Sequence, residues 1–317
     1  MSDAATGDSK ARPEAAGQPA PDQPALDAGG RGQSALKGCL IMLAATVFFS
    51  SMHATVRVLS DDIHPFEIAF FRNLFGIVAI APWVFKYGFG FLRTRRLGLH
   101  AGRALLNVFT MLAFFTALSL SPLALVQALG FTAPLFTTVL AIFLLGEKVR
   151  ARRWAALVIG FAGVAVILRP GVQPLELGAL LSVGSAAIWG LCLIMIKKLS
   201  RTDSALTITA YMVLFMTPLS FIAAAFVWVW PTPTQLVWLF ACGLLGTFGQ
   251  WMMAQSFRYA DATVVLPLDF GKIVWGASIG YFFFDELIDG WTWLGAIIIF
   301  AGALYITMRE RQLERAR

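Results

Sequence analysis

Charged residues are scarce in this chain of 317 residues. Asp, Glu, Lys and Arg together make up 14% of the sequence, against about 25% in a typical soluble protein. Hydrophobic residues make up 58%, and they are gathered into runs of the length that crosses a bilayer, about 20 helical residues. This composition excludes a soluble domain of useful size and predicts an all-α integral membrane protein.

The sequence also has few residues and motifs of the kind that enzymes use. Its three cysteines, Cys39, Cys192 and Cys242, lie far apart and lack metal-ligand spacing, so we expect neither a metal site nor a disulfide framework. The phosphate-binding motif G-x-x-x-x-G-K-[ST] is absent, as are a metal-binding His/Glu motif and a Ser/His arrangement. We therefore expect no enzyme activity, no cofactor and no ATP-driven transport by this chain alone.

Ten apolar runs follow a polar N-terminal stretch. Residues 1–35 are rich in Ala, Pro and Gly and have no apolar periodicity, which predicts a disordered tail. Proline, glycine or charged residues separate most of the runs that follow. The predicted membrane helices are 37–58, 66–85, 101–120, 123–145, 153–169, 177–197, 205–229, 235–256, 262–284 and 291–308.

The basic residues are distributed unevenly among the predicted loops. If the N-terminus is cytoplasmic, nearly all of the 25 Lys and Arg residues fall in inner loops or in the two tails, and Arg169 is the basic residue of the outer loops. This bias is typical of membrane proteins and predicts that both termini are cytoplasmic. It also accounts for the net charge of +7 without nucleic-acid binding.

The second half of the sequence repeats the first at a spacing of 139 or 140 residues. Because each unit holds five spans, an odd number, the second copy enters the membrane from the opposite side, as in the inverted repeats of secondary transporters. The sequence thus predicts two inverted five-helix repeats, 36–170 and 171–310, between the tails 1–35 and 311–317. The matched residues include Arg57 with Lys197, Phe131 with Phe270, Glu147 with Glu286, Trp154 with Trp293 and Gly163 with Gly302.

These features resemble the drug/metabolite transporter superfamily, and within it the EamA-like family. The resemblance is carried by the stretches Pro65–Arg72, Leu144–Glu147 and Phe284–Glu286, together with Trp293–Ala296. Within the family, the chain most resembles bacterial members that take up S-adenosylmethionine or riboflavin. The resemblance implies a proton- or gradient-coupled carrier of small metabolites that works by alternating access in the bacterial inner membrane.

The sharpest candidate for a functional site is the pair Asp269 and Lys272 in the ninth predicted helix. At three residues apart the two side chains share one helical face. The preceding Pro267 removes a backbone donor and Gly271 loosens the helix, so a kink is expected here. A charge in hydrocarbon costs at least about 2.5–3.5 kcal/mol, so the pair is expected to face protein or a wet cavity. It is predicted to bind substrate or a proton, with a purely structural ion pair as the alternative.

Other polar and aromatic residues lie within the remaining predicted helices. Arg72 lies deep in the second helix, where a carboxylate-bearing substrate or Asp269 could pair with it. His53 could carry a coupling proton, since histidine titrates near neutral pH, with a hydrogen-bonded packing histidine as the alternative. For the neutral residues, hydrogen bonds between helices are the alternative, and aromatic rings could stack on a flat substrate. The predicted substrate-binding residues are Asp269, Lys272, Arg72, His53, Trp189, Tyr211, Gln127, Gln250 and Trp251, and the predicted structural residues are Pro267, Gly271, Glu147 and Glu286.

The sequence therefore predicts a secondary active transporter of a small organic metabolite. A membrane-embedded enzyme and a passive channel or facilitator are the alternatives. The expected partners are the lipid bilayer and the small-molecule substrate, and the chain is expected to be a monomer or a homodimer.

Overall fold

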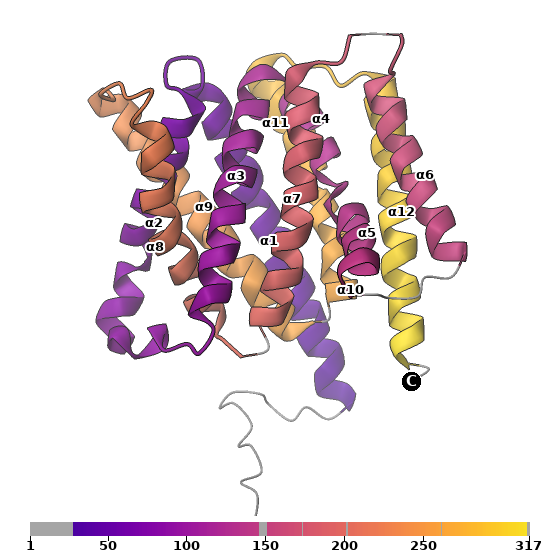
Figure 1. Cartoon of the computed structure of the whole chain (residues 1–317), viewed down its shortest axis with the longest axis horizontal. Coiled ribbons are helices and arrows are strands. Elements are labelled where there is room, and N and C mark those ends of the chain that lie inside the picture. Colours follow the sequence, from indigo (N-terminus) through magenta and orange to yellow (C-terminus); the bar gives the residue numbers. More distant parts are fainter. Residues whose placement is uncertain (1–27, 146–150, 173, 201, 261, 316–317) are drawn as a thin grey trace, which may run out of the picture.

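The chain forms a bundle of long helices that run side by side along one direction (Figure 1). This computed structural model describes residues 28–145, 151–172, 174–200, 202–260 and 262–315. The helices in chain order are α1 (Ala28–Leu59), α2 (Pro65–Tyr87), the 3₁₀ helix η1 (Gly88–Leu92), α3 (Leu97–Leu120), α4 (Leu123–Gly130), α5 (Ala133–Leu145), α6 (Ala151–Leu168), α7 (Leu177–Leu199), α8 (Ala205–Ala224), α9 (Pro233–Tyr259), α10 (Ala262–Val265), the 3₁₀ helix η2 (Leu266–Phe270), α11 (Gly271–Phe284) and α12 (Gly290–Arg315).

The outside of the bundle is apolar along much of its length. Over the described part of the chain, seven helical segments are long and apolar enough to cross a membrane. Large apolar side chains such as Val158, Ile222 and Phe282 stand exposed on its perimeter, where a soluble protein would place charged groups. The molecule is a multi-pass integral membrane protein.

Three helix ends differ from the sequence-based expectation by five residues or more. One is the end of α12, which runs to Arg315 instead of 308 and so into the predicted tail 311–317. Helix α1 begins at Ala28, whereas a disordered tail was expected as far as residue 35. Adding residues to a helix that already exists is far easier than starting a new one. Residues 1–27 lie outside the described residues. Helix α8 ends at Ala224 instead of 229, because the chain turns there and the Trp228 ring packs 5.7 Å and 5.6 Å from the rings of Phe70 and Phe71.

The fourth and ninth predicted helices are each interrupted in the middle of the bundle. Between α4 and α5 the chain breaks at Phe131 and Thr132, and the Thr132 hydroxyl donates to the Leu129 carbonyl at 2.7 Å. In the ninth segment the 3₁₀ turn η2, which contains Pro267, separates α10 from α11. Proline lacks the backbone N–H that an interior helical turn needs. The two interruptions meet, with the Phe131 and Phe270 rings 5.0 Å apart.

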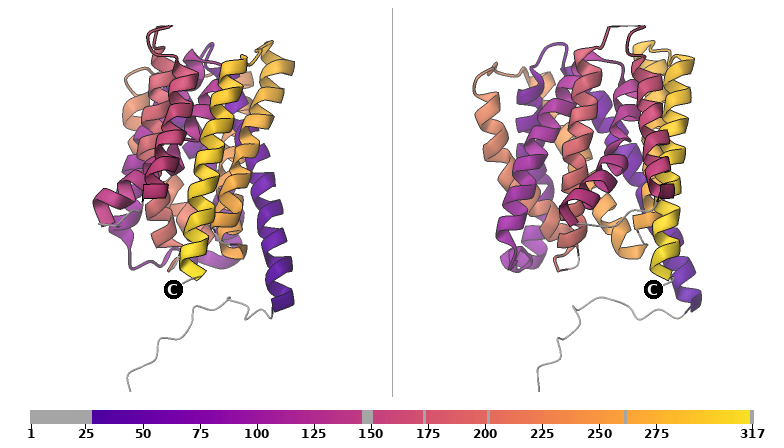
Figure 2. Two further views of the ribbon diagram at one scale, coloured as in Figure 1. Left: turned by 90° about the vertical axis from the view of Figure 1, so that its right-hand side faces the viewer. Right: turned by 45° about the vertical axis from the view of Figure 1, so that its right-hand side comes forward.

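Helices far apart in the sequence lie side by side in the bundle. Helix α1 packs on α9 and α3 packs on α7, while α6 and α12 form a pair at one edge (Figures 1 and 2). The N-terminal end of α1 and the C-terminal end of α12 lie at the same end of the molecule, and the connection between α6 and α7 lies at the opposite end. We call the end that holds both chain termini the terminal end and the other the distal end.

The α6–α12 contact depends on glycine. A Cβ atom at Gly163 would lie 2.8 Å from the Gly295 carbonyl oxygen and 2.9 Å from a side-chain carbon of Ile299. A Cβ at Gly295 would lie 2.6 Å from the Gly163 carbonyl oxygen. Such close approach of two backbones is typical of helix pairs in membranes, which are held by packing and not by a hydrophobic driving force.

We expect Gly163→Val to force α6 and α12 apart and to destabilise the protein by about 1–3 kcal/mol, the usual effect of overpacking. The midpoint of thermal unfolding of the detergent-purified protein should fall. Gly184→Val is the matched control, because Gly184 lies on α7 with nothing within 4 Å of its would-be Cβ. Equal midpoints for the two variants would contradict this account of the contact.

Candidate functional site

A cavity of about 180 Å³ lies in the middle of the bundle. Its walls come from α1, α2, α3, α7, α8 and α9 and from the two interrupted segments, so both halves of the sequence contribute. Seven of the nine residues predicted to bind substrate line it, namely His53, Arg72, Gln127, Trp189, Gln250, Asp269 and Lys272. We call this the central cavity.

Asp269 and Lys272 flank the junction between η2 and α11. The Lys272 Nζ lies 2.6 Å from Asp269 Oδ1, and both side chains are mostly buried. The same Nζ lies 4.4 Å from the centre of the Phe49 ring, a cation–π distance. Ser50 on α1 donates to the Lys272 carbonyl at 3.2 Å. The interrupted helix therefore places an ion pair at the cavity wall and ties its backbone to α1.

Arg72 reaches the cavity from α2 and is almost fully buried, with 5% of its surface exposed. Its Nη1 donates to Asn73 Oδ1 at 2.8 Å, and Asn73 in turn donates to the Ser220 hydroxyl at 3.2 Å. Gly246 on α9 makes the room, because a Cβ there would lie 2.7 Å from Arg72 Nε. The expectation that Asp269 pairs with Arg72 is not met in this structure, since Asp269 contacts Lys272.

His53 and Gln127 bring α1 and α4 together at the cavity. The His53 Nδ1 lies 3.5 Å from the Gln127 amide nitrogen. The His53 ring is flanked by Phe49 and Phe114, whose ring centres lie 6.4 Å and 4.9 Å away. Gly276 on α11 leaves the room that the Gln127 amide fills. His53 is thus a buried ring at the cavity edge with one polar neighbour.

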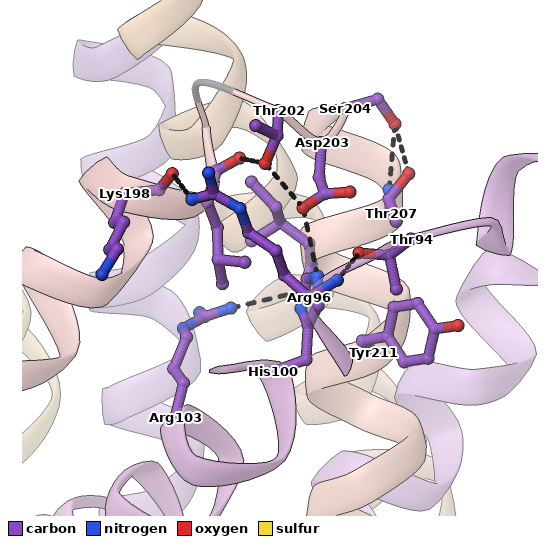
Figure 3. A network of polar contacts seen from close by, with 12 residues as sticks. Thr94, Arg96, His100, Arg103, Lys198, Thr202, Asp203, Ser204, Thr207 and Tyr211 are labelled. Atoms are coloured by element: carbon purple, nitrogen blue, oxygen red, sulfur yellow. Dashed lines mark hydrogen bonds and ion pairs between the residues drawn. The ribbon is translucent and has the colours of Figure 1, made fainter. Parts of the chain in front are cut away.

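Tyr211 and Trp251 lie away from the central cavity. Figure 3 shows the Tyr211 ring beside His100, with the two ring centres 4.7 Å apart. The Tyr211 hydroxyl donates to the Leu92 carbonyl at 2.6 Å, so its polar atom already has a partner. Trp251 packs on Trp83, with ring centres 5.6 Å apart. Their residue types alone could not indicate which face of each helix would meet the cavity.

Sequence reasoning missed most of the cavity wall. Methionine, phenylalanine and small polar residues form much of it, and within apolar helices these residue types carry no signal that separates a cavity wall from a lipid-facing or packed side chain. The lining residues that were not predicted include Met52, Met111, Met212, Met216, Met253, Phe49, Phe114, Phe115, Phe131, Asn107, Thr110 and Ser185.

Glu286 joins three segments at the distal end of the bundle. Its Oε1 lies 3.5 Å from Arg57 Nε on α1, and its Oε2 accepts the Leu123 backbone N–H at 2.9 Å. Arg57 also donates to the Ser119 carbonyl at 3.0 Å. One carboxylate thus joins α1, the start of α4 and the segment that follows α11. Its repeat counterpart, Glu147, lies outside the described residues.

Contacts between the halves also hold the terminal end (Figure 3). Arg96 donates to the Lys198 carbonyl at 3.2 Å, and Thr207 donates to the Phe91 carbonyl at 2.7 Å. The His100 Nε2 lies 3.5 Å from Asp203 Oδ2. The central cavity is therefore bracketed by polar contacts at both ends.

A second cavity, of about 260 Å³, lies at the distal end beside Glu286. Its ionisable residues already have partners. Glu286 pairs with Arg57, Asp289 contacts Arg169 at 2.6 Å, and Glu176 accepts from Ser121 at 3.4 Å. This cavity is larger than the central one, yet it holds none of the residues predicted to bind substrate, whereas the central cavity holds seven of the nine, so the central cavity is the candidate site.

The chain has relatives among known proteins. The sequence profile of the EamA-like transporter family matches residues 36–169 and again residues 176–308. A Rickettsia bellii protein named S-adenosylmethionine uptake transporter is 32% identical over 270 residues, which cover 85% of this chain and 93% of that protein. A Vibrio cholerae protein named riboflavin transporter is 33% identical over 287 residues, which cover 88% and 96%. One solved crystal structure, 19% identical, aligns with a TM-score of 0.59 over 90% of this chain and 99% of that chain.

Proposed function

The chain belongs to the EamA-like transporter family, and we propose that it is a secondary active transporter that moves a small organic metabolite across the bacterial inner membrane by alternating access. The observation that carries the proposal is the central cavity. It lies between the two halves of the chain, where two interrupted helices meet and where ionisable side chains line the wall. Sites of this kind at the bilayer midplane are typical of secondary transporters.

The architecture that we propose is ten membrane spans arranged as two inverted five-span repeats. Its first support is the contact pattern. Under the repeat, α1 corresponds to α7 and α3 to α9, and the packing of α1 on α9 is mirrored by the packing of α7 on α3. The packing of α5 on α7 is likewise mirrored by that of α11 on α1.

Further support comes from helices and residues that pack against their own counterpart in the other repeat. Such pairs can touch only near the axis that relates the two halves. Helices α2 and α8 pack together, as do α6 and α12, and the Phe131 and Phe270 rings lie 5.0 Å apart. A pseudo-two-fold axis through these contacts would let the halves exchange conformations and so open the cavity first to one side and then to the other.

The sidedness that we propose places the terminal end in the cytoplasm. Both described ends of the chain lie there. So do the basic residues Arg93, Arg95 and Arg96 of the connection before α3, and Lys198 at the end of α7. Acidic Asp61, Asp62 and Asp289 belong to connections at the other end. This is the charge bias expected when the basic end faces inward.

We propose that the substrate is a small metabolite that contains a flat heterocycle. Two relatives that align over most of their length are named for S-adenosylmethionine and riboflavin, and both compounds contain a flat heterocycle. The cavity offers aromatic side chains on which a ring can stack. The cavity volume of about 180 Å³ is below the roughly 300–1,000 Å³ of typical ligand pockets, so binding would require the bundle to open further. Asp269 is the lining group that we propose to carry a coupling proton, because Arg72 and Lys272 line the same cavity and disfavour a further positive charge on His53.

Reconstitution into proteoliposomes tests the function. We expect radiolabelled riboflavin or S-adenosylmethionine to accumulate with saturation kinetics and to respond to an imposed pH gradient. Flux that rises linearly with concentration would indicate a passive channel, and recovery of a chemically altered compound would indicate an enzyme. Either outcome would refute the proposal.

We expect Asp269→Asn and Lys272→Ala each to lower the transport rate about tenfold or more, the effect of losing one charged contact worth about 1.5–3 kcal/mol. The charge-swapped double variant, Asp269→Lys with Lys272→Asp, separates function from structure. It keeps an ion pair across the same turn, so it should insert normally yet stay inactive. If the swapped protein transports normally, the pair is a structural ion pair and its assignment to the site is wrong.

We expect Glu286→Gln to loosen the distal closure, because the amide cannot form the ion pair with Arg57. In a variant without the three native cysteines, a Cys introduced at Thr110 in the cavity wall should react up to about fivefold faster with a charged thiol reagent applied from the distal face, as the loss of a partly exposed ion pair worth up to about 1 kcal/mol implies.

Asp289→Asn is the matched control for this experiment. It breaks the Arg169–Asp289 contact at the same end, also between the halves, but neither residue lines the central cavity. If the two variants label at the same rate, the Glu286 contacts do not close the path to the cavity.

A further inference from the structure

The described residues that line the central cavity carry an excess of positive charge. Arg72, Asp269 and Lys272 are the charged members of that lining. With His53 counted as neutral, two cations and one carboxylate give a net charge of one positive. The surplus is not shared evenly along the wall, because Asp269 and Lys272 lie 2.6 Å apart and neutralise each other. The uncompensated charge is therefore that of Arg72.

Arg72 has hydrogen-bond donors left over. A guanidinium carries five N–H groups, and the structure assigns one contact, from Nη1 to the neutral amide oxygen of Asn73 at 2.8 Å. Its Nε is buried without a hydrogen-bond partner, and no carboxylate contacts the side chain within the described part of the chain. A buried cation that lacks an anion is costly, and a bound anion would remove that cost.

A second arginine stands behind the same wall. Arg103 on α3 is 1% exposed, and its Nη1 donates to the Ile208 carbonyl at 3.3 Å. Its Nη2 lies 3.6 Å from the sulfur of Met212, and Met212 lines the cavity. These neutral partners leave its charge in place. Both buried guanidinium groups thus favour negative charge on this side of the cavity.

The rest of the wall is apolar and polarisable. Phe49, Phe114 and Trp189 offer ring faces, and several methionines offer thioether groups, which pack well against aromatic rings. A ligand that fits both features has a flat ring at one end and an anionic group at the other. The neutral alcohols of a sugar-like tail would leave Arg72 without its counterion.

We infer that the substrate carries one negative charge, most simply a carboxylate, beside a flat ring, and that Arg72 binds the anionic group. The inference rests on the transport function proposed above and names the substrate class of that same site. It sets an order of preference, with ring carboxylates above neutral rings and neutral rings above cations. S-adenosylmethionine has a carboxylate, but its ammonium and sulfonium groups give it a net positive charge, so it falls last in this order. Riboflavin, which is neutral, falls between.

The test uses pairs of compounds of nearly the same shape, in which a negatively charged carboxylate is replaced by a neutral amide. Nicotinate and nicotinamide, indole-3-acetate and indole-3-acetamide, and flavin-10-acetate and its amide are titrated against the purified full-length protein, and binding is followed calorimetrically. We expect each carboxylate that binds to do so about tenfold or more tightly than its amide, the usual value of a charge-assisted hydrogen bond.

Variants connect this preference to Arg72. Arg72→Gln should abolish the preference, so that each carboxylate binds no more tightly than its amide, and measurable binding of the amide shows that the variant is folded. Arg72→Lys should retain part of the preference, because it keeps the charge but not the planar fork of donors. Arg258→Gln, which removes an exposed arginine at the end of α9, should leave the preference intact.

The outcomes separate the inference from the function on which it rests. Proteoliposomes made from the same preparation report transport independently. If riboflavin or S-adenosylmethionine is transported with saturation but the amides bind as tightly as the carboxylates, or no carboxylate binds, the inference is wrong and the transport function stands. If Arg72→Gln keeps the carboxylate preference, the assignment to Arg72 is wrong. If no compound is bound or transported, the proposed function itself fails.

Discussion

Hydrocarbon can neither hydrogen-bond a peptide group nor solvate a charge, and this constraint explains where the helix interruptions and the buried charges of the described residues lie. Interrupted helices free backbone groups that would be costly against lipid, so the two interruptions face each other in the interior, with Phe131 against Phe270. The charged side chains follow the same rule. Lys272 lies against Asp269 and an aromatic ring, and Arg72 fits into space left by Gly246. The central cavity is the place where these requirements are met together.

The residues that hold the bundle together match between the two halves of the chain, whereas the charged residues of the central cavity do not. Elements that match across the two halves, such as α6 with α12, build the bundle through close backbone packing at Gly163 and Gly295. The charged pair has no equivalent in the first half, where the matching positions are Gly130 and Ala133. A symmetric frame suits a process in which two conformations must have similar free energy, whereas a ligand without internal symmetry needs an asymmetric wall.

Much of the fold was readable from the sequence because the bilayer constrains it so strongly. The membrane class, the family and the transporter assignment were predicted from apolar runs, charge bias and motifs, and the family match and the named relatives confirm them. The site was readable only where a residue type was unusual for its surroundings, as with Arg72, His53, Asp269 and Lys272. Tyr211 and Trp251 look equally suitable in the sequence, but helix rotation turns them toward Leu92 and Trp83. The methionines that line the central cavity could not be predicted from the sequence, because they are as apolar as their neighbours.

The unpaired guanidinium of Arg72 also bears on how the membrane voltage would act on such a carrier. A fixed charge that faces first one side and then the other crosses part of the transmembrane field, which is worth about 2.3 kcal/mol per elementary charge per 100 mV for a full crossing. With an empty cavity the reorienting step would carry net positive charge and feel the voltage. With a monoanion bound to Arg72 the same step would be electrically silent. The resting potential of the cell would then change the rate at which the empty carrier returns, and it would not change the rate at which the loaded carrier reorients.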